Sequence, residues 1–329
     1  MRPSLPAAAG SACLRPTSRL DKPSAIGDEV TVFAPPSALR AQDTVQLVAP
    51  AGPFDRASFD RGLEVLSSRY RPRFDDGIFS RSRYLAGDDD RRLAELTSAW
   101  RNDEVRALFA ARGGYGVMRL LARLDVEALP HKPIVGFSDL TALHLALQAK
   151  GRISIHAPVV TQLGRSSPEV VQRLFDLLER DVVAPPLTAT ETFVGGRAEG
   201  PLIGGNLSVL TRLIGTPYLP DLTGAILLLE DVTERPYRLD RMWTHLRLAG
   251  VFEKVRGIAL GEFTHCEEKG EAWGPLDVLR DLAREVNLPC ASGFPIGHGE
   301  VNCAVPLGVR VRLDADARTL EFLEPAVRR

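Results

Sequence analysis

The chain has 329 residues, and 44% of them are hydrophobic, so it can bury one large core or two ordinary ones. Its 41 Lys and Arg residues nearly balance its 42 Asp and Glu residues, and the net charge of -1 excludes a broad electrostatic attraction to nucleic acid or to an anionic membrane. A small molecule or a peptide is therefore the expected partner.

The four cysteines show no Cys-x-x-Cys spacing, so neither a zinc site nor a disulfide framework is indicated. Reduced thiols in a cytosolic protein are expected instead. No apolar run approaches the roughly 18 to 20 residues that span a bilayer. We therefore expect a cytoplasmic protein that holds no metal.

Residues 1–42 precede the first patterned segment and are rich in Pro, Ala, Ser and Arg. Pro3, Pro6, Pro16 and Pro23 interrupt any continuous apolar core of the kind that a signal peptide needs. This composition predicts a disordered tail, or a translation start placed too far upstream. Removal of residues 1–40 should then cost little stability.

Strands and helices are expected to alternate through residues 43–164. In chain order they are a strand at 43–50, helices at 58–70 and 90–102, a strand at 105–111, a helix at 116–124, a strand at 133–137 and a helix at 140–149. Such alternation predicts an α/β fold with a parallel sheet covered on both faces. We interpret 43–164 as an N-terminal α/β domain.

A linker is expected at 165–198, where one helix at 168–178 is followed by Pro-Pro and Gly-Gly pairs. A second, C-terminal domain is expected over 199–329. Its expected elements are a strand-turn-helix at 202–213, a strand at 225–229, a helix at 239–249, a strand at 257–261, a helix at 275–285 and paired strands at 305–313 and 319–323.

Ser138 follows the apolar strand at 133–137 and directly precedes a helix. A serine in this place can act as a nucleophile, because its hydroxyl lies at the sheet edge beside the free N–H groups of a helix N-terminus. An ordinary N-cap serine has the same sequence context, and Leu140 stands where the nucleophile-elbow pattern has its second glycine. Both interpretations stay open at this point.

Two polar residues in the second half of the chain could complete a catalytic site. Glu230 ends the apolar run at 225–229 and could orient another group, although a salt bridge to Arg235 or Arg238 would explain it equally well. His298 lies between two glycines in a loop, which suits a general base but also suits a solvated side chain. Serine, glutamate and histidine in this chain order are the components of one known type of catalytic triad.

A glycine-rich loop at 112–116 follows the strand at 105–111. Its backbone N–H groups could bind an oxyanion, and a plain tight turn is the alternative. Arg119 stands where a dinucleotide-binding Gly-x-Gly-x-x-Gly pattern needs its last glycine, and no Gly-Lys-Ser/Thr follows. The loop therefore meets neither the dinucleotide nor the Walker pattern.

Several short motifs occur together in a fixed order over residues 45–323. They are Val48-Ala49-Pro50, Ala111-Arg112-Gly113-Gly114-Tyr115-Gly116, Val135-Gly136-Phe137-Ser138-Asp139, Gly204-Gly205-Asn206-Leu207-Ser208, Leu229-Glu230-Asp231-Val232, Tyr237-Arg238-Leu239-Asp240-Arg241-Met242 and Gly297-His298-Gly299. On these motifs the chain resembles the LD-carboxypeptidases, or muramoyltetrapeptide carboxypeptidases, of serine peptidase family S66. The familiar form of the family's elbow has Tyr where this chain has Phe137.

The resemblance implies an N-terminal α/β domain with the nucleophile elbow and a smaller, β-rich C-terminal domain. It implies that Ser138 is the nucleophile and that Glu230 and His298 complete the triad in a groove between the domains. It also implies a homodimer that needs no metal or cofactor.

General chemistry then assigns further roles. The N–H groups of Asp139 and of Gly113 or Gly114 would bind the developing oxyanion. Arg238 or Arg241 would bind the free carboxylate of the substrate through a bidentate pair.

The function implied by the resemblance is removal of the terminal D-alanine from murein tetrapeptide in peptidoglycan recycling. One alternative is a peptidase of the same family that gives immunity to microcin C-type peptide-nucleotide antibiotics, and another is a two-domain ligand binder without catalysis. The segment 165–198 contains Phe175 and Phe193 but no Trp or Tyr, so it offers little surface for stacking a base. This favours the murein peptide.

Overall fold

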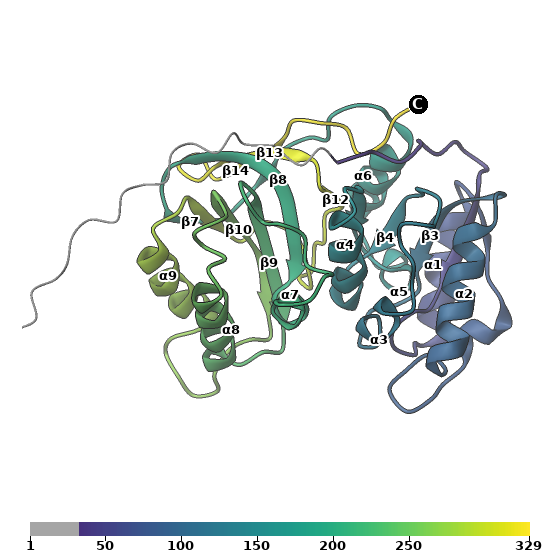
Figure 1. Ribbon diagram of the computed structural model, residues 1–329, viewed down its shortest axis with the longest axis horizontal. Coiled ribbons are helices and arrows are strands. Elements are labelled where there is room, and N and C mark those ends of the chain that lie inside the picture. The colour runs from purple at the N-terminus through teal and green to yellow at the C-terminus, as the bar shows by residue number, and fades with distance from the viewer. Residues whose placement is uncertain (1–32) are drawn as a thin grey trace, which may run out of the picture. The chain divides into compact units, whose positions relative to one another are not determined.

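Two β-sheets organise residues 33–329, the part of the chain that the computed structural model describes (Figure 1). The first sheet contains β1 (Thr44–Val48), β2 (Arg71–Arg73), β3 (Val105–Ala110), β4 (Ile134–Gly136), β5 (Ser154–His156) and β12 (Val305–Leu307). The strand order is β12-β5-β4-β3-β1-β2, and all neighbours are parallel except β12, which runs antiparallel to β5. The parallel α/β sheet expected in the first half is therefore confirmed.

The second sheet makes the C-terminal half rich in β-structure. Its strands are β6 (Leu187–Thr188), β7 (Glu191–Val194), β8 (Arg197–Asn206), β9 (Ile226–Val232), β10 (Gly257–Thr264), β11 (Cys290–Ser292), β13 (Arg310–Asp314) and β14 (Thr319–Phe322). The strand order is β6-β14-β13-β8-β9-β10-β11-β7. The central strands from β8 to β11 are parallel, and the outer pairs are antiparallel.

The helices of the described residues connect these strands. They are α1 (Arg56–Ser67), α2 (Asp89–Arg101), α3 (Met118–Leu121), α4 (Thr141–Gln148), α5 (Val160–Leu163), α6 (Pro168–Glu179), α7 (Leu207–Leu213), α8 (Pro236–Leu248) and α9 (Pro275–Val286), with 3-10 turns η1 (Asp76–Phe79) and η2 (Ser138–Leu140). Asp55, Asp88 and Ser167 cap α1, α2 and α6 by accepting a backbone N–H bond from the first turn. Helix α4 is buried and contacts both β5 and β8, so it lies between the two sheets (Figure 1). Among the described residues, none of the helices combines the length and the apolar character that a bilayer-spanning helix needs.

The strand expected at 305–313 is in fact two strands that belong to different sheets. Gly308, with φ of 96°, separates β12 from β13. This turn sends β12 to the first sheet and β13 to the second. The sequence gives no sign of such a change of sheet, because buried apolar residues lie on both sides of Gly308.

The expected linker at 165–198 supplies structural elements as well as a connection. It contains α6 and also β6 and β7, which form the two edges of the second sheet. The division into 43–164, 165–198 and 199–329 stays a prediction, and the pairing of β12 with β5 shows that the C-terminal segment also contributes to the first sheet.

Residues 33–42, which the sequence assigned to a disordered tail, are packed on the fold. Phe33 is 9% exposed and Leu39 is 2% exposed. Ala34 donates a backbone hydrogen bond to Gly151 O at 2.7 Å, and Leu39 donates one to Leu178 O at 2.7 Å. The rest of the predicted tail, residues 1–32, lies outside the described residues.

Truncation can test this packing. A chain that lacks residues 1–42 should melt several degrees below a chain that lacks only residues 1–32, because burying a large apolar side chain is worth about 1.5–3 kcal/mol. Thermal unfolding of the two truncated proteins measures the difference. In the protein that lacks only residues 1–32, Leu39→Ala should lower the melting temperature by part of the same amount. Equal melting temperatures for the two truncated proteins and this variant would contradict the packing.

Candidate active site

Ser138 lies at the carboxyl edge of the first sheet, where β4 passes into η2. Its φ of 64° places a non-glycine residue in the left-handed region, a strain of about 1–3 kcal/mol that is typical of functional positions. The hydroxyl does not cap the helix but is hydrogen-bonded to the ring of His298. The N-cap interpretation therefore does not hold, and the backbone has the strained turn of a nucleophile elbow.

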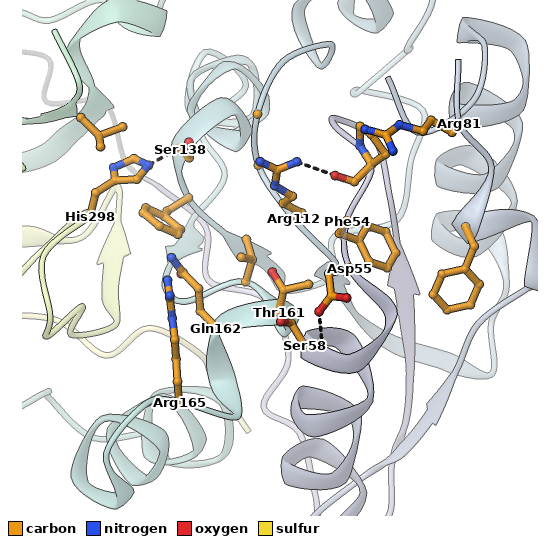
Figure 2. Close-up of a pocket in the computed structure, with 17 residues that line it drawn as sticks. Phe54, Asp55, Ser58, Arg81, Arg112, Ser138, Thr161, Gln162, Arg165 and His298 are labelled. Carbon is orange, nitrogen blue, oxygen red and sulfur yellow. Dashed lines mark hydrogen bonds between the residues drawn. The ribbon is translucent and has the colours of Figure 1, made fainter. Parts of the chain in front are cut away.

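His298 joins Ser138 to Glu230. Its Nε2 lies 3.1 Å from Ser138 Oγ, and its Nδ1 lies 2.6 Å from Glu230 Oε2 (Figure 2 shows the first of these bonds). With the ring proton on Nδ1, Nε2 can accept the hydroxyl proton of Ser138. The His298 side chain is only 15% exposed, so it is not a solvated loop residue.

Glu230 is fully buried within β9. The loop that carries His298 can approach it closely because residue 297 is glycine. A Cβ on Gly297, whose φ is 115°, would lie 2.6 Å from Glu230 Oε2. Arg235 and Arg238 are paired with other glutamates, so the salt-bridge interpretation of Glu230 does not hold.

The backbone of Gly113 is packed against Ser138. A Cβ on Gly113 would lie 2.8 Å from Ser138 Cβ, 2.9 Å from Ser138 Oγ and 3.5 Å from Asp139 N. Gly113 thus lies close both to the hydroxyl of Ser138 and to the backbone nitrogen of Asp139. Gly114 lies against Gly52 instead, with its ideal Cβ 3.4 Å from Gly52 Cα. Of the two predicted glycines, Gly113 is therefore the one in contact with Ser138.

The Asp139 side chain connects the elbow to the glycine-rich loop. It is 2% exposed, and it accepts a hydrogen bond from Val117 N at 2.9 Å. Burial raises the pKa of this carboxyl to about 6, although the bond from Val117 and the charge of Arg92 oppose the rise.

Arg238 and Arg241, which were expected to bind the carboxylate of the substrate, lie away from Ser138. They are on α8, and neither lines the cavity beside Ser138. Arg238 is half exposed and paired with Glu234, and both guanidinium groups lie over the ring of Tyr237. The structure does not bring these two arginines to Ser138, because the helix presents them to solvent.

The cavity beside Ser138 has a volume of about 890 Å³ and contains arginines that sequence reasoning missed. Arg81, Arg112 and Arg165 line it together with Ser138 and His298 (Figure 2). Arg112 donates to the backbone oxygen of Pro53, and none of the three arginines forms an ion pair within residues 33–329. Arg112 belongs to the glycine-rich motif, and this was the one sequence feature that could have identified a cavity arginine.

A second cavity of about 1160 Å³ shares His298 and Arg165 with the first. The two cavities therefore form one groove with the Ser138–His298 pair near their junction. The lining of the second cavity is acidic, whereas that of the first is mainly basic. Its carboxylates are Glu262, Glu267, Asp277 and Glu300.

The site lies at the edge of an α/β sheet and joins a serine, a histidine and a buried carboxylate by hydrogen bonds. Peptidases and related hydrolases use this arrangement for acyl transfer. Comparison with known proteins identifies the family. Residues 45–157 match the LD-carboxypeptidase N-terminal domain, and residues 199–313 match the LD-carboxypeptidase C-terminal domain. The chain belongs to the LD-carboxypeptidase family, peptidase family S66.

Two sequence relatives and two solved structures show what the chain is similar to. The murein tetrapeptide carboxypeptidase of Pseudomonas aeruginosa is 35% identical over 83% of this chain and 93% of its own length. The solved muramoyltetrapeptide carboxypeptidase of Oxalobacter formigenes has a TM-score of 0.76 at 28% identity, over 85% of this chain and 97% of its own. The microcin C7 self-immunity protein of Escherichia coli is 26% identical over 93% of this chain and 96% of its own length. A solved microcin C7 self-immunity protein has a TM-score of 0.81 at 25% identity, over 89% of this chain and 99% of its own.

The buried Asp139 carboxyl predicts a pH dependence of stability. Its folded pKa of about 6 lies above the ordinary value of 3.8, so its contribution is fully present below pH 3.8 and is lost as pH rises through 6. Between pH 5 and 7.5 the wild type should therefore lose more stability than Asp139→Asn, which cannot ionise and can still accept the Val117 bond. Over this pH window the difference should be about 1 kcal/mol, because only about one unit of the pKa shift lies above pH 5. Denaturant titrations at both pH values measure it, and parallel losses in the two proteins would contradict the assignment.

Proposed function

We propose that the protein is a serine carboxypeptidase in which Ser138 is the nucleophile, His298 the general base and Glu230 the carboxylate that orients the imidazole. The observation that carries the proposal is the continuous hydrogen-bonded series from Glu230 through His298 to Ser138, which opens into a cavity. A ligand binder without chemistry has no need of the strained backbone at Ser138.

In the proposed mechanism, His298 Nε2 takes the proton of Ser138 as Oγ attacks the scissile carbonyl. The N–H groups of Asp139 and Gly113 stabilise the developing oxyanion, and one such donor is typically worth about 2.7–4 kcal/mol. The imidazolium then gives its proton to the leaving amine. Water, activated by the same histidine, hydrolyses the acyl-enzyme and restores Ser138.

The terminal carboxylate of the substrate needs a cation near the scissile bond. Arg112 is the first candidate, because it directly precedes Gly113 and has donors left beyond its bond to Pro53. Arg165 is the second, because it lines the groove on both sides of His298. These residues replace Arg238 and Arg241 in the proposal.

The proposed substrate is murein tetrapeptide, cleaved at the L,D-peptide bond before its terminal D-alanine. The names of the Pseudomonas and Oxalobacter relatives support this choice. The aromatic residues that line the two cavities are phenylalanines, with no Trp or Tyr among the lining residues, so the groove offers little surface for stacking a base. A cytoplasmic location, a role in peptidoglycan recycling and a homodimer stay predictions.

Turnover measurements test the substrate. The purified protein should release D-alanine from murein tetrapeptide, and the rate should fall at least about tenfold when the last residue is L-alanine or its carboxylate is amidated. Amidation removes the charge of the carboxylate, and L-alanine places the carboxylate in a different position from D-alanine. In either case a charged hydrogen bond is lost, which costs about 1.5–3 kcal/mol. Arg112→Met should narrow the gap between the acid and the amide, whereas Arg238→Met should leave it unchanged.

Equal rates for all three peptides would contradict recognition of the terminal carboxylate. Faster cleavage of a peptidyl-adenylate than of the tetrapeptide would instead support the antibiotic-immunity function.

A further inference from the structure

Arg92, on α2, is a fully buried arginine that lies outside both cavities of the groove. Burial of a guanidinium is costly unless its N–H groups are hydrogen-bonded and its charge is paired. The contacts of Arg92 meet most of that need, and they lie beside the loops that shape the candidate active site.

Arg92 bonds to two separate loops at once. Its Nη1 donates to Pro50 O and, at 2.9 Å, to Gly116 O, while its Nη2 is paired with Asp89. Pro50 begins the loop that reaches Pro53 in the cavity wall, and Gly116 ends the glycine-rich loop. The guanidinium is thus a shared support beneath both loops.

The two loops also contact each other next to the nucleophile. Gly52 N donates to Gly113 O at 3.0 Å, and Gly113 is the residue packed against Ser138. A displacement of either loop would therefore move the Gly113 backbone relative to Ser138 Oγ.

The glycine-rich loop is shaped closely around Arg92. A Cβ on Gly116, whose φ is 136°, would lie 2.5 Å from Arg92 Nη1. The next residue, Val117, donates its N–H to the Asp139 carboxylate. The loop is therefore held at one end by Arg92 and by the side chain of the residue after the nucleophile.

We infer that Arg92 is a positioning residue that holds the Gly113 backbone in place for the oxyanion formed at Ser138. The inference rests on the proposed role of Ser138 as nucleophile but not on the identity of the peptide. Arg92 touches no reacting atom, and its effect passes through the carbonyls of Pro50 and Gly116.

Kinetics of Arg92→Lys and Arg92→Met test this role. At a temperature where thermal melts show each variant folded, Arg92→Met should lower kcat about 10- to 100-fold with KM changed less than about threefold, because a misplaced donor affects the transition state more than substrate binding. Arg92→Lys should retain more activity, since an ammonium can still donate to the carbonyls. Arg119→Met is the matched control, because Arg119 pairs with the same Asp89 from the solvent side.

The rate of fluorophosphonate labelling is a second readout that needs no peptide. In that reaction the Ser138 Oγ–P bond forms, fluoride leaves and His298 takes the hydroxyl proton, so the rate should fall in parallel with kcat. The labelling rate reports on the role of Arg92 even if the wild type does not cleave murein tetrapeptide.

Two outcomes would overturn the inference. Variants that melt at lower temperatures but keep the wild-type kcat and labelling rate would show that Arg92 has a purely structural role. If neither Arg92 variant folds, Gly116→Ala should give the same kinetic defect, and a normal labelling rate in that variant would overturn the inference as well.

Discussion

The burial of the Glu230 carboxylate is the constraint on which the candidate site depends. A buried carboxylate that loses its partner costs several kcal/mol, and here Oε2 is satisfied by His298 Nδ1 at 2.6 Å. Oε1 has no hydrogen-bond partner among the described residues, so this one bond carries most of the compensation. The same bond fixes the orientation and the tautomer of the imidazole, which is what a general base for Ser138 requires.

The fold brings this pair to the nucleophile by joining the two sheets around α4. Asn206, at the end of β8, donates its backbone N–H to Thr141 Oγ1 at the start of α4, at 3.0 Å. Its side chain donates to Asp231, the residue after Glu230. The helix that follows Ser138 and the strand that carries Glu230 are therefore linked through one asparagine. The hydrogen bond between Ser138 and His298 joins the same two halves of the chain.

Local sequence patterns predicted the strands and helices around the candidate triad, but they left the roles of Ser138, Glu230 and His298 open. Short apolar runs before Ser138 and Glu230 indicate buried strand ends, whereas Ser138 and His298 are 160 positions apart and meet only through the packing of two sheets. The family resemblance supplied that connection. The arginines of the cavity were missed because nothing in the local pattern distinguishes Arg165 from an exposed arginine, while Arg238 stood in a recognisable motif and points to solvent.

Peptide mapping after reaction with a fluorophosphonate tests the central claim, that Ser138 is a nucleophile activated by His298 and Glu230. Mass spectrometry of the digested wild type should find one adduct, on Ser138, and intact mass should show almost none in His298→Ala or Glu230→Ala protein that remains folded. An adduct on another serine would contradict the account. So would undiminished labelling of Ser138 in the folded His298 and Glu230 variants.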